Sequence, residues 1–261
     1  MLKTLTLLFL ALASAKASPI LGSAQNFAVL GGNITNAGAT TINGDLGLYP
    51  GSSITGLGSI TLTGILHSGD GIALQAQGDI LAAWTTLSAM PATTDLTGQD
   101  LGTVGTLTPS IYMFSSSAVL TGALTLDFGN NANSAFVFLV GSSLTTAPGS
   151  SVTVINGGAH NSIYWVVGSS ATLGTSTGFA GNILADQSVT LNTTASICGR
   201  VIALNGAVTL DTNSVSNNCA PQDFGSLGFS GGTDPATNEV PEPSSLWMVG
   251  GGFIAYLRRK R

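Results

Sequence analysis

Residues 163–210 read IYWVVGSSATLGTSTGFAGNILADQSVTLNTTASICGRVIALNGAVTL, and one short unit occurs in them three times. Ser170-Ala-Thr-Leu173 returns as Ser188-Val-Thr-Leu191 and as Ala207-Val-Thr-Leu210, at offsets of 18 and 19 residues. Short alternating runs broken by Gly, Ser or Asn are typical of short strands joined by tight turns. A period near 18 residues allows three such strands per coil, so the sequence predicts an all-β solenoid of triangular section.

The alternation within these strands indicates which side chains face the core. In Ala171-Thr172-Leu173 the outer two residues point inward and the Thr points outward, because successive side chains of a strand lie on opposite faces. Val189-Thr190-Leu191 and Val208-Thr209-Leu210 repeat the pattern. Stacked coils would therefore bury ladders of aliphatic side chains and expose ladders of Thr on a flat surface. Such a surface explains how a chain with only 7% charged residues can be soluble.

One segment departs from the strand pattern. Residues 68–90 carry apolar side chains at spacings of four, four, four and three, which predicts one face of an α-helix. These residues are Ile72, Ala76, Ile80, Trp84 and Leu87. Ser68 or Asp70 can cap the start of the helix, and Pro91 stops it. We expect the helix to cover one flank of the solenoid and to leave the other two faces open.

The composition excludes several classes of function. Between Lys16 and Arg258 the only basic residue is Arg200, whereas binding of nucleic acids or nucleotide phosphates needs several Lys or Arg side chains. The chain has two His residues, no Glu before Glu239, and Asp residues that are scattered along the sequence. We therefore expect no enzymatic activity, no cofactor, no metal site and no nucleic-acid partner.

The start of the chain has the pattern of an export signal. Residues 1–17 combine Lys3, an apolar run and an Ala-x-Ala site, which is typical of a secretory signal peptide. The folded domain is then expected over residues 18–220. A flexible linker rich in Gly and Ser follows at 221–239.

The last segment, residues 240–261, places Pro241-Glu242-Pro243 before an apolar stretch and a basic cluster at 258–261. This order resembles the PEP-CTERM sorting signal of Gram-negative bacteria. The resemblance implies an extracellular or cell-surface protein, recognition by an exosortase-type sorting enzyme, and transient anchoring in the inner membrane. The apolar stretch 246–257 would act as a transmembrane helix, although its twelve residues are fewer than the ~17–20 that usually span a bilayer.

Two cysteines, Cys198 and Cys219, remain after removal of the signal peptide. An exported protein permits a disulfide between them. Two separate free thiols are the alternative.

Several blocks of the domain resemble one known family. They are LGSAQNFAVL at 21–30, GDLGLYPG at 44–51, LTGQDLG at 96–102, NSIYWVVGSSATLG at 161–174 and GRVIALNGAVTLDTN at 199–213. The family is the ice-binding-like proteins that contain the DUF3494 domain, and the resemblance covers about residues 20–218. It implies an irregular right-handed β-helix with one long α-helix packed along it. It also implies a secreted antifreeze protein that binds an ice crystal surface and inhibits ice recrystallisation. We expect a monomer.

The resemblance also suggests where ice would bind, because active faces in the family carry a T-A/G-x-T/N pattern. The matches here give a favoured candidate face of Thr146, Ser150, Thr175, Thr177, Thr193 and Ser196. A competing face follows the more regular Thr ladder of the repeats: Thr145, Thr172, Thr190, Asn192 and Thr209.

A different function remains open for the same surface. A flat, uncharged face of hydroxyls and amides suits a glycan as well as ice. The alternative is therefore a structural or adhesive matrix protein associated with exopolysaccharide.

Overall fold

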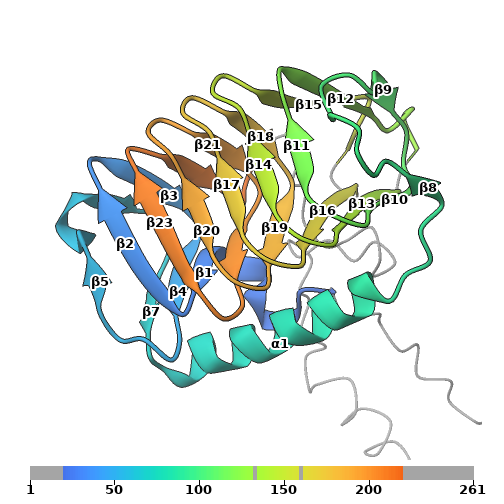
Figure 1. Ribbon diagram of the computed structural model, residues 1–261. Helices are drawn as coiled ribbons and strands as arrows, with labels where there is room; N and C mark the ends of the chain where they lie inside the picture. Colours follow the sequence, from blue (N-terminus) through green and yellow to red (C-terminus); the bar gives the residue numbers. More distant parts are fainter. Residues whose placement is uncertain (1–19, 132–133, 159–160, 220–261) are drawn as a thin grey trace, which may run out of the picture.

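The computed structural model describes residues 20–131, 134–158 and 161–219. Over these residues all paired strands are parallel, and they form three sheets that are the three sides of a solenoid (Figure 1). Most coils contribute one strand to each sheet. The predicted all-β solenoid with one α-helix is therefore confirmed.

The three sheets are named A, B and C. Within the described residues, sheet A has nine strands in the order β7 (Leu66–Ser68), β4 (Asp45–Leu48), β1 (Phe27–Gly31), β22 (Val201–Ala203), β19 (Asn182–Ala185), β16 (Ser162–Val167), β13 (Ala135–Val140), β10 (Ile111–Phe114) and β8 (Thr94–Asp95). Sheet B runs β11 (Ala118–Leu120), β14 (Leu144–Thr146), β17 (Ala171–Leu173), β20 (Val189–Leu191), β23 (Ala207–Asp211), β2 (Asn33–Ala37) and β5 (Ile54–Thr55). Sheet C runs β6 (Ile60–Leu62), β3 (Thr40–Asn43), β24 (Ser214–Ser216), β21 (Ser196–Cys198), β18 (Gly178–Ala180), β15 (Ser151–Ile155), β12 (Ala123–Asp127) and β9 (Thr106–Leu107).

The coils do not stack in chain order. The chain first builds β1 to β7 at one end, and α1 (Gly71–Ser88) then runs along the flank to the other end, where β8 begins (Figure 1). The later coils stack back toward the start. In the last coil β22 pairs with β1, β23 with β2, and β24 with β3. The final coil of the chain therefore lies directly against its first coil.

Aromatic and aliphatic side chains fill the inside of the solenoid. The rings of Phe138 and Trp165 stack with centroids 3.9 Å apart, and Tyr112 stacks on Phe138 at 5.3 Å. The indole Nε1 of Trp165 donates a hydrogen bond to the Ala180 carbonyl at 3.0 Å, so this fully buried ring leaves no polar atom unpaired. Such stacking holds neighbouring coils in a fixed register.

The helix begins where the sequence predicts. Asp70 is its N-cap: Oδ1 accepts hydrogen bonds from the backbone N–H groups of Ala73 at 2.8 Å and Ile72 at 3.1 Å. The last helical residue is Ser88, three positions before Pro91. The helix packs on sheet A through a cluster that includes Tyr164.

The predicted apolar stripe of this helix was only partly right. The buried residues are Ala73, Ala76, Ile80, Ala83 and Leu87, whereas Ile72 is 53% exposed and Trp84 is half-buried. A step of four residues turns a helix by 40° more than a full circle, so three such steps in succession leave the face. The observed alternation of three and four stays on it.

The disulfide is present: Cys198 on β21 is bonded to Cys219, with Cα atoms 5.9 Å apart. It fixes the end of the described chain to sheet C. Among the described residues no helix is long and apolar enough to cross a membrane. The predicted signal peptide 1–17, linker 221–239 and sorting segment 240–261, with its expected transmembrane helix, lie outside the described residues.

Candidate functional site

The outer surface of sheet B carries an unbroken row of threonines in strict register, here called the Thr row. One Thr comes from each of six neighbouring strands, in the order Thr145, Thr172, Thr190, Thr209, Thr35 and Thr55. Val119 of β11 pairs with Thr145 and ends the row. All six side chains are exposed or half-buried, while the residues on either side of them within the strands point inward.

The spacing of the Thr row follows from the coil repeat. Neighbouring parallel strands lie about 4.8 Å apart, so six residues in register span about 24 Å. Thr is β-branched, so its χ1 is restricted and its hydroxyl and methyl groups hold fixed directions. The row is therefore a rigid, evenly spaced line of hydroxyls and methyls.

A second line of small residues, all of them polar except Ala207, runs beside the Thr row. Two positions before each Thr stands a residue on the same face: Ser143, Ser170, Ser188, Ala207, Asn33 and Ser53. Alternate residues of a strand lie about 6.6–7 Å apart. Ser117 continues this line, and its Oγ is 2.9 Å from Oγ of Ser143. The two lines together make a two-dimensional array without an ionised group.

No described element covers this array. The helix packs on the outward residues of sheet A, such as Leu184 and Ile202, and not on sheet B. Figure 1 shows the sheet B strands side by side, with α1 running along a different side of the solenoid.

One carboxylate stands at the margin of sheet B. Asp211 lies two residues after Thr209, and its carboxylate accepts hydrogen bonds from the hydroxyls of Thr193 and Thr212 in the adjoining corner. The charge is therefore held at the corner and not within the Thr row. Asn192, the remaining member of the competing face, is exposed at the same corner.

The favoured candidate face from the sequence does not form a surface. Thr146, Ser150 and Thr177 are 2%, 1% and 0% exposed, so none of them can touch a partner. Thr175 and Thr193 are exposed in the turns between sheets B and C, and Ser196 is exposed on sheet C. The six residues are thus divided between the interior, a corner and a second sheet.

The buried threonines have a structural role at the corner. Oγ1 of Thr146 and Oγ1 of Thr177 are hydrogen-bonded at 2.8 Å, and Thr146 Oγ1 also accepts from the Gly174 N–H at 2.8 Å. Ser150 Oγ donates to the Leu120 carbonyl at 3.0 Å. Ser150 Oγ also accepts from the Gly122 N–H at 3.2 Å, so buried hydroxyls satisfy backbone N–H groups where the chain passes from one sheet to the next. At the corners, therefore, a Thr can be buried because its hydroxyl bonds the backbone.

Sequence reasoning missed Thr35 and Thr55. Both stand in triplets of the same form as those of the repeats, Asn33-Ile34-Thr35 and Ser53-Ile54-Thr55. A search for a small polar residue, an apolar residue and a Thr would have found them. Their distance in sequence from residues 143–210 concealed that they belong to the same row.

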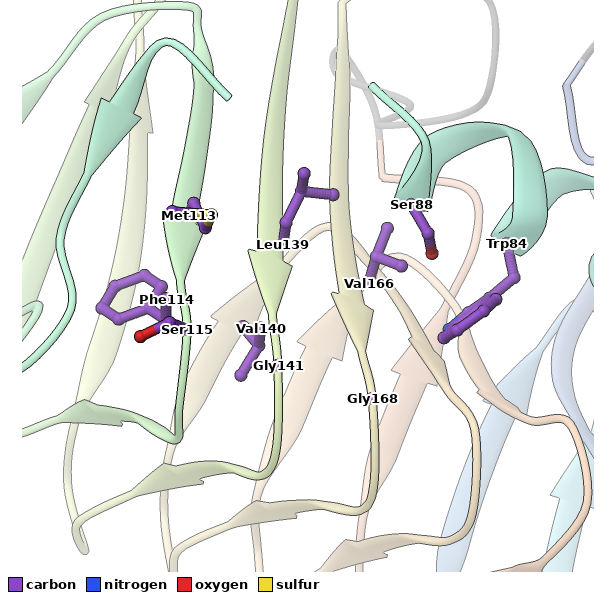
Figure 2. Close-up of a pocket in the computed structure, with 10 residues that line it drawn as sticks. All are labelled: Trp84, Ser88, Met113, Phe114, Ser115, Leu139, Val140, Gly141, Val166 and Gly168. Atoms are coloured by element: carbon purple, nitrogen blue, oxygen red, sulfur yellow. The ribbon is translucent and has the colours of Figure 1, made fainter. Parts of the chain in front are cut away.

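A separate hollow of about 430 Å³ lies between the end of α1 and sheet A. Figure 2 shows Trp84 and Ser88 of the helix beside Val166, Leu139 and Met113 of neighbouring strands. No ionisable side chain lines it. Among the described residues no group of His, Cys, Asp or Glu could hold a metal ion. This hollow therefore offers none of the groups that acid–base catalysis needs.

The chain resembles proteins of known type over most of its length. The family model described as "Ice-binding-like" matches residues 29–216, and the model for the PEP-CTERM protein-sorting motif matches 239–261. An ice-binding protein of Nostoc sp. (strain HG1) is 48% identical over 249 residues, which are 94% of this chain and 87% of that protein.

Solved structures agree with these matches. An ice-binding protein from an Antarctic biological consortium superposes with a TM-score of 0.72 at 41% identity, over 82% of this chain and 96% of that one. An ice-binding protein from the Antarctic ascomycete Antarctomyces psychrotrophicus gives a TM-score of 0.72 at 38% identity, over 77% of this chain and 98% of that one.

Proposed function

Since the chain belongs to the ice-binding-like family, we propose that it binds the surface of ice crystals through the Thr row of sheet B. Family membership makes it a binding protein and not an enzyme. The observation that carries the proposed site is the unbroken register of six threonines on six strands.

The proposed mechanism rests on the regular spacing of the array. Hydroxyls at fixed intervals hold water molecules in repeating positions, and the methyl groups between them limit competing arrangements. Sheets usually twist, so the proposed mechanism requires that coil stacking keep sheet B flat enough for a planar partner. Each contact is weak, so adhesion depends on many aligned contacts at once.

The experiment places a bulky side chain in the middle of the row. Thr190→Trp should abolish ice shaping and thermal hysteresis in a nanolitre osmometer, because the indole holds the neighbouring threonines away from the crystal. The matched control is Thr41→Trp on sheet C, where Thr41 is also exposed and pairs with another Thr. Both variants should give the circular dichroism spectrum of the parent. Full hysteresis in Thr190→Trp, with loss in Thr41→Trp, would move the site to sheet C.

The glycan alternative is tested with the same proteins. Round, unshaped ice crystals together with retention on exopolysaccharide would favour a matrix protein. Shaped crystals without glycan retention support ice binding alone.

The sorting motif and the family indicate an exported or cell-surface protein. We further propose transient inner-membrane anchoring in a Gram-negative cell, followed by exosortase-type cleavage near Pro241-Glu242-Pro243. Mass spectrometry of the exported protein should then find a chain that ends near this motif. An exported chain that still ends at Arg261 would argue against cleavage.

A further inference from the structure

One end of the solenoid is formed by residues 52–68, here called the end coil. Its strands β5, β6 and β7 are the last strands of sheets B, C and A, and β5 marks this end at the left of Figure 1. Within the described residues each of the three strands pairs with a neighbour on one side only. Their other edges carry unpaired backbone N–H and C=O groups, so this end offers hydrogen-bonding groups as well as side chains.

The inward side chains of the end coil are not fully covered. Four of them pack against the core and yet remain half-buried: Ile54, Ile60, Leu62 and Leu66. Their partners one coil further in are at most 1% exposed: Ile34, Thr40, Ile42 and Leu46. Two more apolar residues of the end coil, Leu57 and Ile65, are 40% and 63% exposed. Together the six apolar residues of the end coil make a surface here called the open end.

The opposite end of the solenoid is closed by the chain itself. Its last coil, residues 94–107, contains β8 and β9, and Asp100 forms a bridge with Val119 of β11. The inward residues of that coil are 6%, 0% and 8% exposed: Leu96, Leu101 and Leu107. A short stretch of chain with apolar side chains is therefore enough to close an end. The open end has no such cover among the described residues.

The open end also lacks the features that protect exposed strand edges. Residues 52–66 read SSITGLGSITLTGIL and contain no charged residue and no Pro. Edge strands that stay exposed usually carry such residues, because charge and Pro prevent pairing with other chains. An uncharged edge beside the exposed Leu57 and Ile65 is therefore expected to be covered in the folded protein.

The described part of the chain ends close to the open end. Asn217 follows β24 and donates its backbone N–H to the Asn43 carbonyl at 3.1 Å, and the Asn43 side chain accepts from Thr63 of the end coil at 2.7 Å. The disulfide holds Cys219 against Cys198 of β21. Three strand spacings of about 4.8 Å separate β21 from the edge strand β6 in sheet C, which is about 14 Å. The chain therefore continues from a fixed point near the open end.

The next ten residues are long enough to reach it. Residues 220–229 read APQDFGSLGF. An extended residue spans about 3.3 Å, so Phe224 can lie up to about 17 Å from Cys219, and Phe229 up to about 33 Å. Both lengths exceed the ~14 Å between β21 and the edge strand.

The same ten residues carry apolar side chains that a linker does not need. Between Cys219 and Val240 the only large apolar residues are Phe224, Leu227 and Phe229. Residues 230–239 read SGGTDPATNE, a composition that serves a linker without them. The apolar half of the segment is thus the half that begins beside the open end.

We propose that residues 224–229 dock on the open end and close it, with their large apolar side chains over Leu57 and Ile65. This proposal replaces the linker expected at 221–229 and keeps it at 230–239. A tethered segment has an effective concentration on the order of millimolar, which favours it over a second copy from solution. The docked segment leaves sheet B free and lies before the sorting motif, so cleavage near Pro241 would not remove it.

Chymotrypsin, which cleaves after Phe and Leu, tests the docking on the full exported protein. A free peptide of residues 220–231 gives the cleavage rate of the undocked segment. In the parent, mass spectrometry should find cleavage after Phe224 and Phe229 at least about tenfold slower than in the peptide, because the protease acts on the fraction of the segment that is undocked.

The double variant Leu57→Lys/Ile65→Lys changes only residues of the open end. It should bring the cleavage rate to within about twofold of that of the peptide, because each apolar contact that is lost weakens docking by about tenfold. The matched control is Leu81→Lys, since Leu81 is 56% exposed but lies on α1. It should be cleaved like the parent, and all variants should keep the circular dichroism spectrum of the parent.

A second variant tests the same contact from the other side. In Phe224→Ser/Leu227→Ser/Phe229→Ser, hydrogen exchange of residues 54–66 should be at least about tenfold faster than in the parent, while exchange in sheet B stays the same. This variant changes no residue of the solenoid, so it decides the matter alone if the double Lys variant does not fold.

Three results would overturn the proposal. The first is cleavage of the parent at the rate of the free peptide. The second is parent-like protection in the folded double Lys variant, or unchanged exchange in the triple Ser variant. The third is protection that is lost on dilution together with a dimer in sedimentation velocity, which would assign the open end to a second copy.

Discussion

Thr177→Val separates the structural threonines of the corner from those proposed to bind ice. Thr177 is fully buried, and Val keeps its shape while removing the hydroxyl. The lost hydrogen bonds are the one to Thr146 Oγ1 at 2.8 Å and the one to the Ala147 carbonyl at 3.3 Å. Thr146 Oγ1 keeps its hydrogen bond from the Gly174 N–H, and the Ala147 carbonyl keeps the one from the Ser150 N–H. The loss is therefore the net contribution of two hydrogen bonds, about 1–3 kcal/mol of unfolding free energy.

That cost can be measured as a shift in melting temperature. For a domain of about 200 residues, 1 kcal/mol corresponds to about 2–4 °C, so Thr177→Val should melt about 2–12 °C lower than the parent. Thermal hysteresis should be unchanged near 0 °C, where the variant is still folded, because Thr177 never reaches the surface. Thr190→Trp should show the reverse: a melting temperature close to that of the parent, and no hysteresis.

The assays are circular dichroism melting and nanolitre osmometry on the same samples. The reasoning is refuted if Thr177→Val melts like the parent, or if it loses hysteresis while fully folded. Either result would mean that Thr177 is not the internal corner residue described above.

Three further predictions concern stability. Asp70→Ala should lower the free energy of unfolding by about 1 kcal/mol in urea denaturation, because it removes the N-cap of α1, while a parent-like value would show that the cap contributes nothing. Replacing Cys198 and Cys219 by Ser should lower the free energy of unfolding by about 3 kcal/mol, because the disulfide joins residues that are 21 positions apart. The same melting temperature for the parent with and without reductant would contradict this. Acid should destabilise the fold: hydrogen bonds from Thr97 lower the pKa of Asp95, and those from the Asn156 side chain and the Gly129 N–H lower the pKa of Asp127. These two carboxylates contribute their full stabilisation above the ordinary carboxyl pKa of 3.8, and the stabilisation is lost as the pH falls through their lower pKa values in the folded state. Melting temperatures measured from pH 5 to pH 2 should therefore fall most below pH 4. A melting temperature that does not change over this range would contradict the prediction.

The local sequence pattern was sufficient to predict the strands and the helix. Alternation in Ala171-Thr172-Leu173 and its repeats determines which side chains face inward, because the strand period is two wherever the chain is extended. The helix was equally predictable from its apolar spacing, the Asp70 cap and Pro91. Its buried face was predicted less well, because three successive steps of four residues leave one face of a helix.

The same reasoning does not predict which side chains are buried at the corners between sheets. At Thr146 and Thr177 the chain turns, and the alternation of the strands no longer decides which way a side chain points. There the backbone N–H groups of Gly174 and Gly122 donate to the buried hydroxyls of Thr146 and Ser150. A motif that matched the exposed pattern of a family was therefore buried.

The sequence by itself determined the coils, the outward threonines of residues 145–209, and the low charge of the surface. Only the tertiary structure decided the full length of the Thr row. The helix carries the chain along the solenoid, so the last coil docks against the first, and Thr209 pairs with Thr35 across 174 residues of sequence. The physical reason is that coil stacking depends on matching strand edges in space, and two edges that match can come from any part of the chain.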